Sequence, residues 1–141
     1  MKFKLDGYCG LYCGACPVML RTKAGKETNP CHGCKSEQIA QRHCSTCGIK
    51  ACARQKGYEF CYECPDLEIC EQMQKFTTDE KWPYHQGVLK NLESIQRDGL
   101  VKWLEIQEAR WQCSNCGAPH SWWDETCAQC GQAVANYQAD K

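Results

Sequence analysis

The sequence lacks a long apolar segment. Charged or polar residues interrupt every apolar stretch of the 141-residue chain well before it reaches the ~18 residues that cross a bilayer. The stretch from Met1 to Asp6 also lacks the apolar core of an export signal. We therefore expect no membrane association and a cytoplasmic location.

The common short motifs of catalysis and nucleotide binding are missing as well. The sequence has no Gly-x-x-x-x-Gly-Lys-Ser/Thr loop, no His-Glu-x-x-His, no Gly-x-Ser-x-Gly and no Gly-x-Gly-x-x-Gly. The alternation of apolar and polar residues that marks strands is weak. These absences favour a non-catalytic interaction or regulatory module over an enzyme.

The chain has no net charge, because 17 basic residues balance 17 acidic ones. The charges are unevenly distributed: residues 1–56 hold ten Lys/Arg and three Asp/Glu, whereas residues 57–80 hold one and seven. We expect these two stretches to face each other or to form a dipolar surface. General nucleic-acid binding needs a positive surface, so a nucleic-acid partner is not expected, and a nucleic-acid-binding zinc protein stays as an alternative function.

Cysteine, by contrast, is abundant, with 15 residues. Thiols stay reduced in the cytoplasm, and an odd number cannot pair completely as disulfides. A two-residue gap lets one loop present two thiolates to a single metal ion. Six pairs have this gap: Cys13/Cys16, Cys31/Cys34, Cys44/Cys47, Cys61/Cys64, Cys113/Cys116 and Cys127/Cys130. The sequence therefore predicts a protein that binds three or four zinc ions.

The cysteines divide the chain into three segments, with eleven in residues 1–75, none in 76–112 and four in 113–130. We predict a cysteine-rich metal-binding domain over 1–75, a two-helix connector over 76–111, and a zinc ribbon with a tail over 112–141. The predicted fold class is a small metal-stabilised protein of short α-helices and irregular zinc knuckles with a C-terminal β zinc ribbon. Metals supply stability that so few large apolar residues cannot.

Apolar spacing and stop signals predict the individual helices. In the connector, one helix begins near Pro83 and stops at Asp98-Gly99, and a second runs from Leu100 to about Arg110. In the first domain, the expected helices run from Pro17 to Gly25, from Ile49 to Lys56 before Gly57, and from Pro65 to about Lys75, and a weaker pattern covers Ser36 to His43.

The clearest metal site is formed by Cys113, Cys116, Cys127 and Cys130. Each of these two pairs is followed by a glycine, which relieves a tight turn. Four sulfurs complete a tetrahedral coordination sphere and leave no position for a reacting water. We expect structural zinc here, with a rubredoxin-like iron site as the alternative.

The eleven N-terminal cysteines allow more than one division. Two tetrahedral sites would use eight of them, and three sites would need twelve ligands, which His32 or His43 could complete. Cys16 and Cys64 both precede a proline at a predicted helix start, where the helix dipole stabilises a thiolate. We therefore expect the pairs of Cys16 and Cys64 to share a metal. The remaining group is then Cys31, Cys34, Cys44, Cys47 and Cys52, with Cys9 and Cys70 as further candidate ligands.

Iron–sulfur and thiol redox chemistry are the rival interpretations. The spacing Cys9-x3-Cys13-x2-Cys16 occurs in radical S-adenosylmethionine enzymes, but Ala15 stands where they place an aromatic residue, and the chain is too short for their barrel. The ferredoxin pattern is absent. A redox-active thiol pair usually lies on a thioredoxin-like core with strands, for which the strand signal is poor.

Histidines and tryptophans complete the set of candidates. His85 and His120 are expected to be surface or packing residues. Trp122 and Trp123 lie between the two C-terminal cysteine pairs. One ring packs on the ribbon or the connector, or a ring stays exposed as an anchor for a protein partner. We therefore expect a protein partner that binds through Trp122 and Trp123.

Four motifs together resemble a known family: Tyr8-Cys-Gly-Leu-Tyr-Cys-Gly-Ala-Cys-Pro17, Cys31-His-Gly-Cys34, Cys47-Gly-Ile-Lys-Ala-Cys52 and Gly57-Tyr-Glu-Phe-Cys-Tyr-Glu-Cys64. Residues from about 8 to 75 are similar to a prokaryotic cysteine-rich family catalogued only as a domain of unknown function (family 3795). The connector and the ribbon look like those of its longer members. The resemblance implies metal binding, with zinc expected, in a bacterial or archaeal cytoplasm, and it implies no substrate or reaction.

Overall fold

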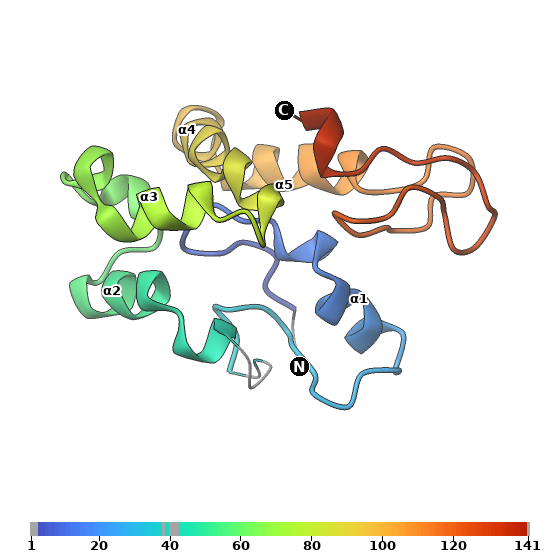
Figure 1. Cartoon of the computed structure of the whole chain (residues 1–141), viewed down its shortest axis with the longest axis horizontal. Helices are drawn as coiled ribbons and strands as arrows, with labels where there is room; N and C mark the ends of the chain where they lie inside the picture. The colour runs from blue at the N-terminus through green and yellow to red at the C-terminus, as the bar shows by residue number, and fades with distance from the viewer. Residues whose placement is uncertain (1–2, 38, 40–42, 141) are drawn as a thin grey trace.

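The computed structural model describes residues 3–37, 39 and 43–140. Helices α2 and α3 lie at one end of the molecule and the C-terminal loops at the other (Figure 1). The 3-10 helices are η1 (Cys13–Ala15), η2 (His43–Thr46), η3 (Cys61–Glu63), η4 (Leu67–Ile69), η5 (Pro83–Gly87) and η6 (Tyr137–Asp140). The α-helices are α1 (Pro17–Lys23), α2 (Gly48–Lys56), α3 (Glu71–Thr78), α4 (Val88–Asp98) and α5 (Leu100–Arg110).

The predicted helices α1, α2 and α5 are confirmed, and the helix expected from Pro83 to Asp98 begins instead as η5 and becomes α4 only at Val88. Pro17 occupies the first turn of α1, where its missing amide has no partner to lose. Helix α2 ends at Gly57, whose φ of 75° is left-handed. The following amide of Tyr58 donates to the Ala53 carbonyl at 2.9 Å and so satisfies the end of the helix. Gly99 separates α4 from α5 with a φ of 90°.

The helix expected from Pro65 to Lys75 is wrong as a continuous element. The chain forms η4, breaks at Cys70 in an extended conformation, and begins α3 at Glu71. The break allows the Cys70 side chain to turn toward other cysteines. The pattern from Ser36 to His43 includes residues 38 and 40–42, which lie outside the described residues, so this helix stays a prediction.

The expected β ribbon is not found among the described residues. There the β structure consists of isolated antiparallel bridges that pair Asp6 with Tyr12, Gln112 with Pro119, and Thr126 with Ala133. The last two bridges flank the two C-terminal cysteine pairs. The chain turns around each pair of thiols, and the two segments that flank the turn separate after one bridge, so that no ladder forms.

One hydrophobic core connects the three predicted segments. Val88, Leu92 and Ile95 share one buried face of α4, and α5 contributes Trp103, which is 2% exposed. The Trp103 ring meets Tyr12 of the N-terminal segment edge-on at a centroid distance of 6.0 Å. Burial of such side chains stabilises the fold by roughly 1.5–3 kcal/mol each, so the cysteine loops are arranged around a packed centre.

The basic and acidic stretches of the chain meet at Lys35. Its ammonium lies 2.8 Å from an Asp6 oxygen and 3.3 Å from a Glu59 oxygen, and 3.7 Å from the centroid of the Phe60 ring. Within the described part of the chain, no helix combines the length and the hydropathy needed to span a bilayer.

Candidate metal centres

The four C-terminal thiols converge on one point. We call Cys113, Cys116, Cys127 and Cys130 the C-terminal cysteine site; their sulfurs all lie within 4.8 Å of one another. The Cys113 and Cys130 sulfurs are 3.6 Å apart, and those of Cys116 and Cys127 are 3.5 Å apart. Sulfurs bound to a single zinc at about 2.3 Å lie about 3.8 Å from one another. The observed spacing therefore suits one tetrahedrally coordinated metal ion.

Two turns of the same construction build this site. In each turn, the amide of the glycine after the pair donates to the carbonyl of the first cysteine, at 2.8 Å from Gly117 to Cys113 and at 2.9 Å from Gly131 to Cys127. Both glycines have a φ of 78°, which glycine adopts without steric cost. The repeated turn gives both thiol pairs the same geometry.

Hydrogen-bond donors surround the sulfurs of the second pair. The Asn115 side chain donates to the Cys130 sulfur at 3.5 Å; this bond and the Gln132 amide lower the pKa of Cys130 to about 6. The amides of Cys130 and Gln129 likewise lower the pKa of Cys127. A lowered pKa favours the thiolate, which is the metal-binding form. The surroundings of Cys127 and Cys130 therefore favour negatively charged sulfur.

A second set of thiols lines a small cavity between α2 and α3, with a volume of about 30 Å³. We call it the four-cysteine cavity; its thiols belong to Cys52, Cys61, Cys64 and Cys70. Cys52 lies on α2, and Cys70 is the N-cap of α3. The volume is close to the share of one water molecule in the liquid, about 30 Å³. The cavity therefore has room for one ion.

The other seven N-terminal cysteines line a single larger cavity of about 250 Å³. We call it the seven-cysteine cavity; its thiols belong to Cys9, Cys13, Cys16, Cys31, Cys34, Cys44 and Cys47. Aromatic side chains also line it, among them Tyr84 of η5 and Trp122 of the C-terminal loop. All fifteen cysteines of the chain are described, and all are free thiols.

Cys34 lies close to several of these seven thiols. Its sulfur and that of Cys9 both lie beside Gly7, at 3.5 and 3.7 Å from the position that a Cβ would take there. A hydrogen bond with Cys13 lowers the pKa of Cys34 to about 7, with help from the Tyr8 amide. Burial, with Cys34 as a charged neighbour, raises the pKa of Cys9 well above its ordinary value. Cys34 thus ionises before Cys9.

Three α-helices begin at a cysteine of these cavities. Cys16, Cys47 and Cys70 are the N-caps of α1, α2 and α3. Burial raises the pKa of Cys16, but the amides of Met19 and Val18 point to it and oppose that rise. The positive end of α1 thus offsets part of the cost of burying a thiolate at Cys16.

The structure does not bring together the two pairs that were predicted to share a metal, because Cys13 and Cys16 line the seven-cysteine cavity and Cys61 and Cys64 line the four-cysteine cavity. Of Cys16 and Cys64, the first begins an α-helix, whereas the chain after Cys64 first forms η4. Cys52, expected with Cys31 and Cys34, instead lines the four-cysteine cavity. Packing of α2 against α3 brings it there.

The three histidines whose side chains are described make ring or backbone contacts. His85 stacks on Phe76 at a centroid distance of 3.7 Å, and His120 is buried with its Nδ1 3.1 Å from the Ser121 carbonyl, so both are packing residues as predicted. The His32 ring stacks on Phe3 at 4.2 Å. The side chain of His43 lies outside the described part of the chain, so its role stays a prediction.

Trp122 and Trp123 have different environments. Trp122 stacks on Tyr84 with ring centroids 4.0 Å apart and is 4% exposed. Trp123 meets Tyr84 and Tyr137 edge-on, at 5.3 and 5.5 Å, and is 40% exposed. One ring thus packs on the connector, and the other remains accessible.

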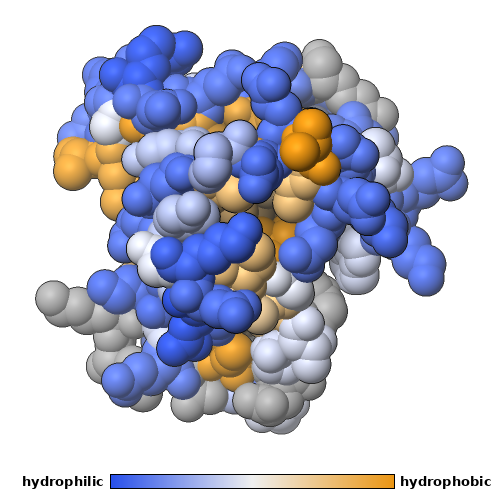
Figure 2. Space-filling view, turned by 90° about the vertical axis from the view of Figure 1, so that its left-hand side faces the viewer, coloured by the Kyte–Doolittle hydropathy of each residue, from blue (hydrophilic) through white to orange (hydrophobic). Residues whose placement is uncertain are grey.

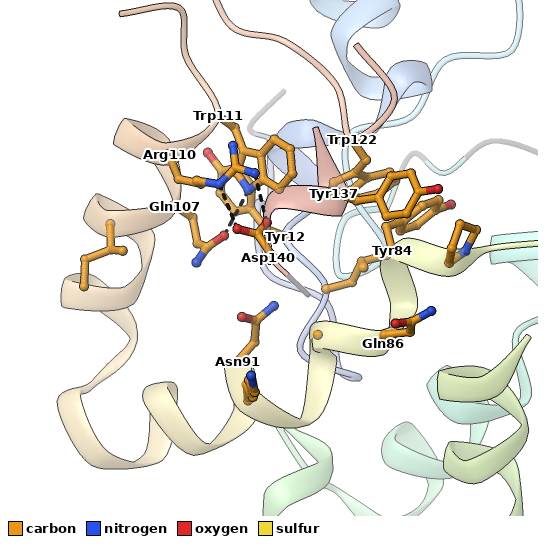
Figure 3. A pocket seen from close by; sticks show the side chains of 15 residues that line it. Tyr12, Tyr84, Gln86, Asn91, Gln107, Arg110, Trp111, Trp122, Tyr137 and Asp140 are labelled. Atoms are coloured by element: carbon orange, nitrogen blue, oxygen red, sulfur yellow. Dashed lines mark hydrogen bonds and ion pairs between the residues drawn. The ribbon is translucent and has the colours of Figure 1, made fainter. Parts of the chain in front are cut away.

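A third cavity, of about 440 Å³, lies where the connector meets the C-terminal segment (Figure 3). The Arg110 guanidinium donates to both Asp140 oxygens, at 3.1 and 3.0 Å, and to the Asn136 carbonyl at 2.8 Å. The Trp111 indole donates to the Gln107 side chain at 3.1 Å. The bonds of Arg110 hold the C-terminal tail against α5 beside this cavity.

Two residues beside the thiols were not predicted. Lys50 of α2 is 9% exposed and lines the seven-cysteine cavity, and Asn115 donates to Cys130. The only sequence signal for either was position, since Lys50 lies between Cys47 and Cys52 and Asn115 between Cys113 and Cys116.

The comparison with protein families agrees with this arrangement. The sequence model of the family described as "Protein of unknown function (DUF3795)" matches residues 5–75, half of the chain. The match includes every cysteine of the four-cysteine and seven-cysteine cavities and ends before the C-terminal cysteine site. No curated protein and no solved structure matches the chain significantly. The chain belongs to the DUF3795 family.

Proposed function

We propose that this is a zinc-binding protein with structural metal ions, acting as a non-catalytic interaction or regulatory module. The spacing of 3.5 to 3.6 Å between sulfurs of the C-terminal cysteine site carries the proposal. Four thiolates in a tetrahedral arrangement are typical of zinc. They leave no position for a reacting water, which favours a structural, zinc-ribbon-like role.

We also infer that the protein works in the cytoplasm of a bacterium or an archaeon. Fifteen free thiols remain reduced only in a reducing compartment. Zinc binding would then protect these thiols from oxidation and hold the short loops together.

The surface favours a protein as the partner, and Trp123 is the side chain that would bind it. The ring is 40% exposed and is held between Tyr84 and Tyr137. A preorganised aromatic side chain loses little entropy on binding. The end of the molecule that carries α2 and α3 is mostly hydrophilic, with separate apolar spots (Figure 2), and suits an apolar anchor less well.

Elemental analysis with a visible spectrum tests the metal. Protein purified without added metal should be colourless and contain zinc. A brown preparation with stoichiometric iron and acid-labile sulfide would contradict the proposal and support the iron–sulfur alternative.

Affinity capture from the native host tests the partner. Trp123→Ala should lose it, whereas Val101→Ala, which alters a 73% exposed residue of α5, should retain it. Trp122→Ala is unsuitable because it removes packing on Tyr84. Retention of every partner by Trp123→Ala would exclude this anchor, and tight, steeply salt-dependent nucleic-acid binding would favour the nucleic-acid alternative.

A further inference from the structure

The eleven N-terminal cysteines divide between two cavities without remainder, four around one and seven around the other. We propose that the four-cysteine cavity binds one zinc ion and that the seven-cysteine cavity binds two zinc ions that share one thiolate. This inference rests on the proposed zinc binding and adds its stoichiometry: four zinc ions per chain, one pair of which is bridged.

The four-cysteine cavity fits a single ion by number and by size. Four thiolates complete one tetrahedral sphere. The cavity of about 30 Å³ has no room for a second metal with its own ligands. Its thiols come from α2, η3 and the N-cap of α3, so the ion would also join these elements.

The seven-cysteine cavity fits neither one ion nor two separate ions. One tetrahedral zinc would leave three buried thiols unused, and two independent zinc ions would need eight ligands. Two tetrahedra that share one corner need seven ligands, which is the number of thiols present. The volume of about 250 Å³ is several times that of the single-ion cavity.

Side-chain rotation would complete both N-terminal sites. Within the described part of the chain, the C-terminal cysteine site is the one set of His, Cys, Asp or Glu side chains with three or more ligand atoms within 4.8 Å of one another. The N-terminal thiols therefore lie farther apart than zinc requires. Each would approach the ions by rotation about χ1, for which cysteine has three staggered positions.

Among the histidines whose side chains are described, His85 is the one that lines the seven-cysteine cavity, and it is a rival eighth ligand. Its ring is stacked on Phe76 at 3.7 Å, and its Nδ1 lies 3.2 Å from the Phe76 carbonyl. These contacts hold the imidazole against Phe76. A shared thiolate is therefore favoured over coordination by His85.

The charges around the cavity agree with two ions and seven thiolates. Such a cluster carries a net charge of about −3. Lys50 lines the cavity at 9% exposure, and Arg21, which pairs with Glu27 at 2.7 Å, lines it as well. Lys35, which pairs with Asp6 and Glu59, lies near Cys34. A buried lysine is costly beside neutral groups, and an anionic cluster next to it offsets that cost.

Cys34 is the thiol we assign to the bridge. Its sulfur lies beside that of Cys9 at Gly7, it shares a hydrogen bond with Cys13, and Cys44 is a further close neighbour. It therefore lies near thiols of the N-terminal loop, Cys9 and Cys13, and near Cys44 from the middle of the N-terminal domain. One zinc would take Cys9, Cys13 and Cys47, the other Cys16, Cys31 and Cys44, and both would take Cys34.

Cadmium-113 NMR of the full chain tests this arrangement, because cadmium replaces zinc in sulfur sites and two cadmium ions that share a sulfur show a scalar coupling. We expect four cadmium resonances, two of them coupled, and four zinc ions per chain by native mass spectrometry. Three resonances, or four without coupling, would overturn the bridged pair while leaving zinc binding intact. Iron with sulfide in place of zinc would overturn the proposed function as well.

Three variants locate the bridge. Cys61→Ser should lose one ion and retain the coupling, whereas Cys34→Ser should lose the coupling. His85→Gln should retain four ions and the coupling; loss of an ion from this variant would identify His85 as the eighth ligand and overturn the shared thiolate. If Cys34→Ser does not fold, the wild-type cadmium spectrum alone decides between bridged and separate ions.

Discussion

Gly33 offers a sharp test of the loop that carries Cys31 and Cys34. Its φ is +108°, and a Cβ on this residue would clash with the backbone carbonyl oxygen of Lys4. Lys4 cannot move away freely, because its amide donates to the His32 carbonyl at 2.7 Å. Gly33→Ala should therefore displace the loop and weaken metal binding in the seven-cysteine cavity.

The size of this effect follows from two costs. A positive φ costs a non-glycine residue about 1–3 kcal/mol, and loss of the Lys4–His32 hydrogen bond costs about 1 kcal/mol. Together they weaken metal binding by about 30-fold to 1,000-fold, since 1.4 kcal/mol is about tenfold.

Competition with a chromophoric zinc chelator measures this loss, and Gly25→Ala is the matched control. Gly25 also has a positive φ, of +71°, but a Cβ there meets nothing within 4 Å, and it lies outside the cysteine loops. The two N-terminal ions of the larger cavity should leave Gly33→Ala at much lower chelator concentration. Equal zinc retention by both variants would refute the argument that the loop binds metal.

Three further predictions concern the C-terminal site and the core. Asn115→Ala should raise the pKa of Cys130. That pKa is lowered in the folded protein, so the Cys130 thiolate stabilises the fold, and this stabilisation is lost as the pH falls toward about 6. This variant should release its zinc at a higher pH and bind it roughly tenfold more weakly, and an unchanged pH profile of zinc release would contradict the role of Asn115. Cys127→Ser should lose one zinc by native mass spectrometry while the N-terminal ions remain, and loss from a second site would show that the segments are interdependent. Trp103→Ala should cost about 3–5 kcal/mol in denaturant unfolding, whereas Trp103→Phe should cost far less, because the buried indole nitrogen has no hydrogen-bond partner; equal losses would contradict this.

Local sequence signals were sufficient to predict the fold where a single residue determines the backbone conformation. Helix α2 ends at Gly57, and α4 and α5 are separated at Gly99, because a positive φ at these positions favours glycine. The C-terminal cysteine site could also be predicted from the sequence, because its four ligands come from two turns within eighteen residues. In both cases the decisive contacts are close in sequence.

Packing between distant segments decided what the sequence did not predict. Cys70 lies at the break in the expected helix and lines one cavity with Cys52, Cys61 and Cys64, and this grouping depends on how α2 packs against α3. The likeness of Cys16-Pro17 to Cys64-Pro65 was misleading, because helix starts alone do not determine which thiols meet. Strand formation in the C-terminal segment was overestimated for a related reason, since two tight turns with one bridge each are enough to position the four sulfurs.

X-ray absorption at the zinc edge tests the central claim that sulfur alone holds the metals. The account predicts a first shell of four sulfur atoms at about 2.3 Å averaged over all ions, with no nitrogen or oxygen scatterer. A nitrogen or oxygen ligand at about 2.0–2.1 Å in the zinc-loaded full chain would contradict it, because such a ligand would mean a histidine, a carboxylate or an open position with bound water.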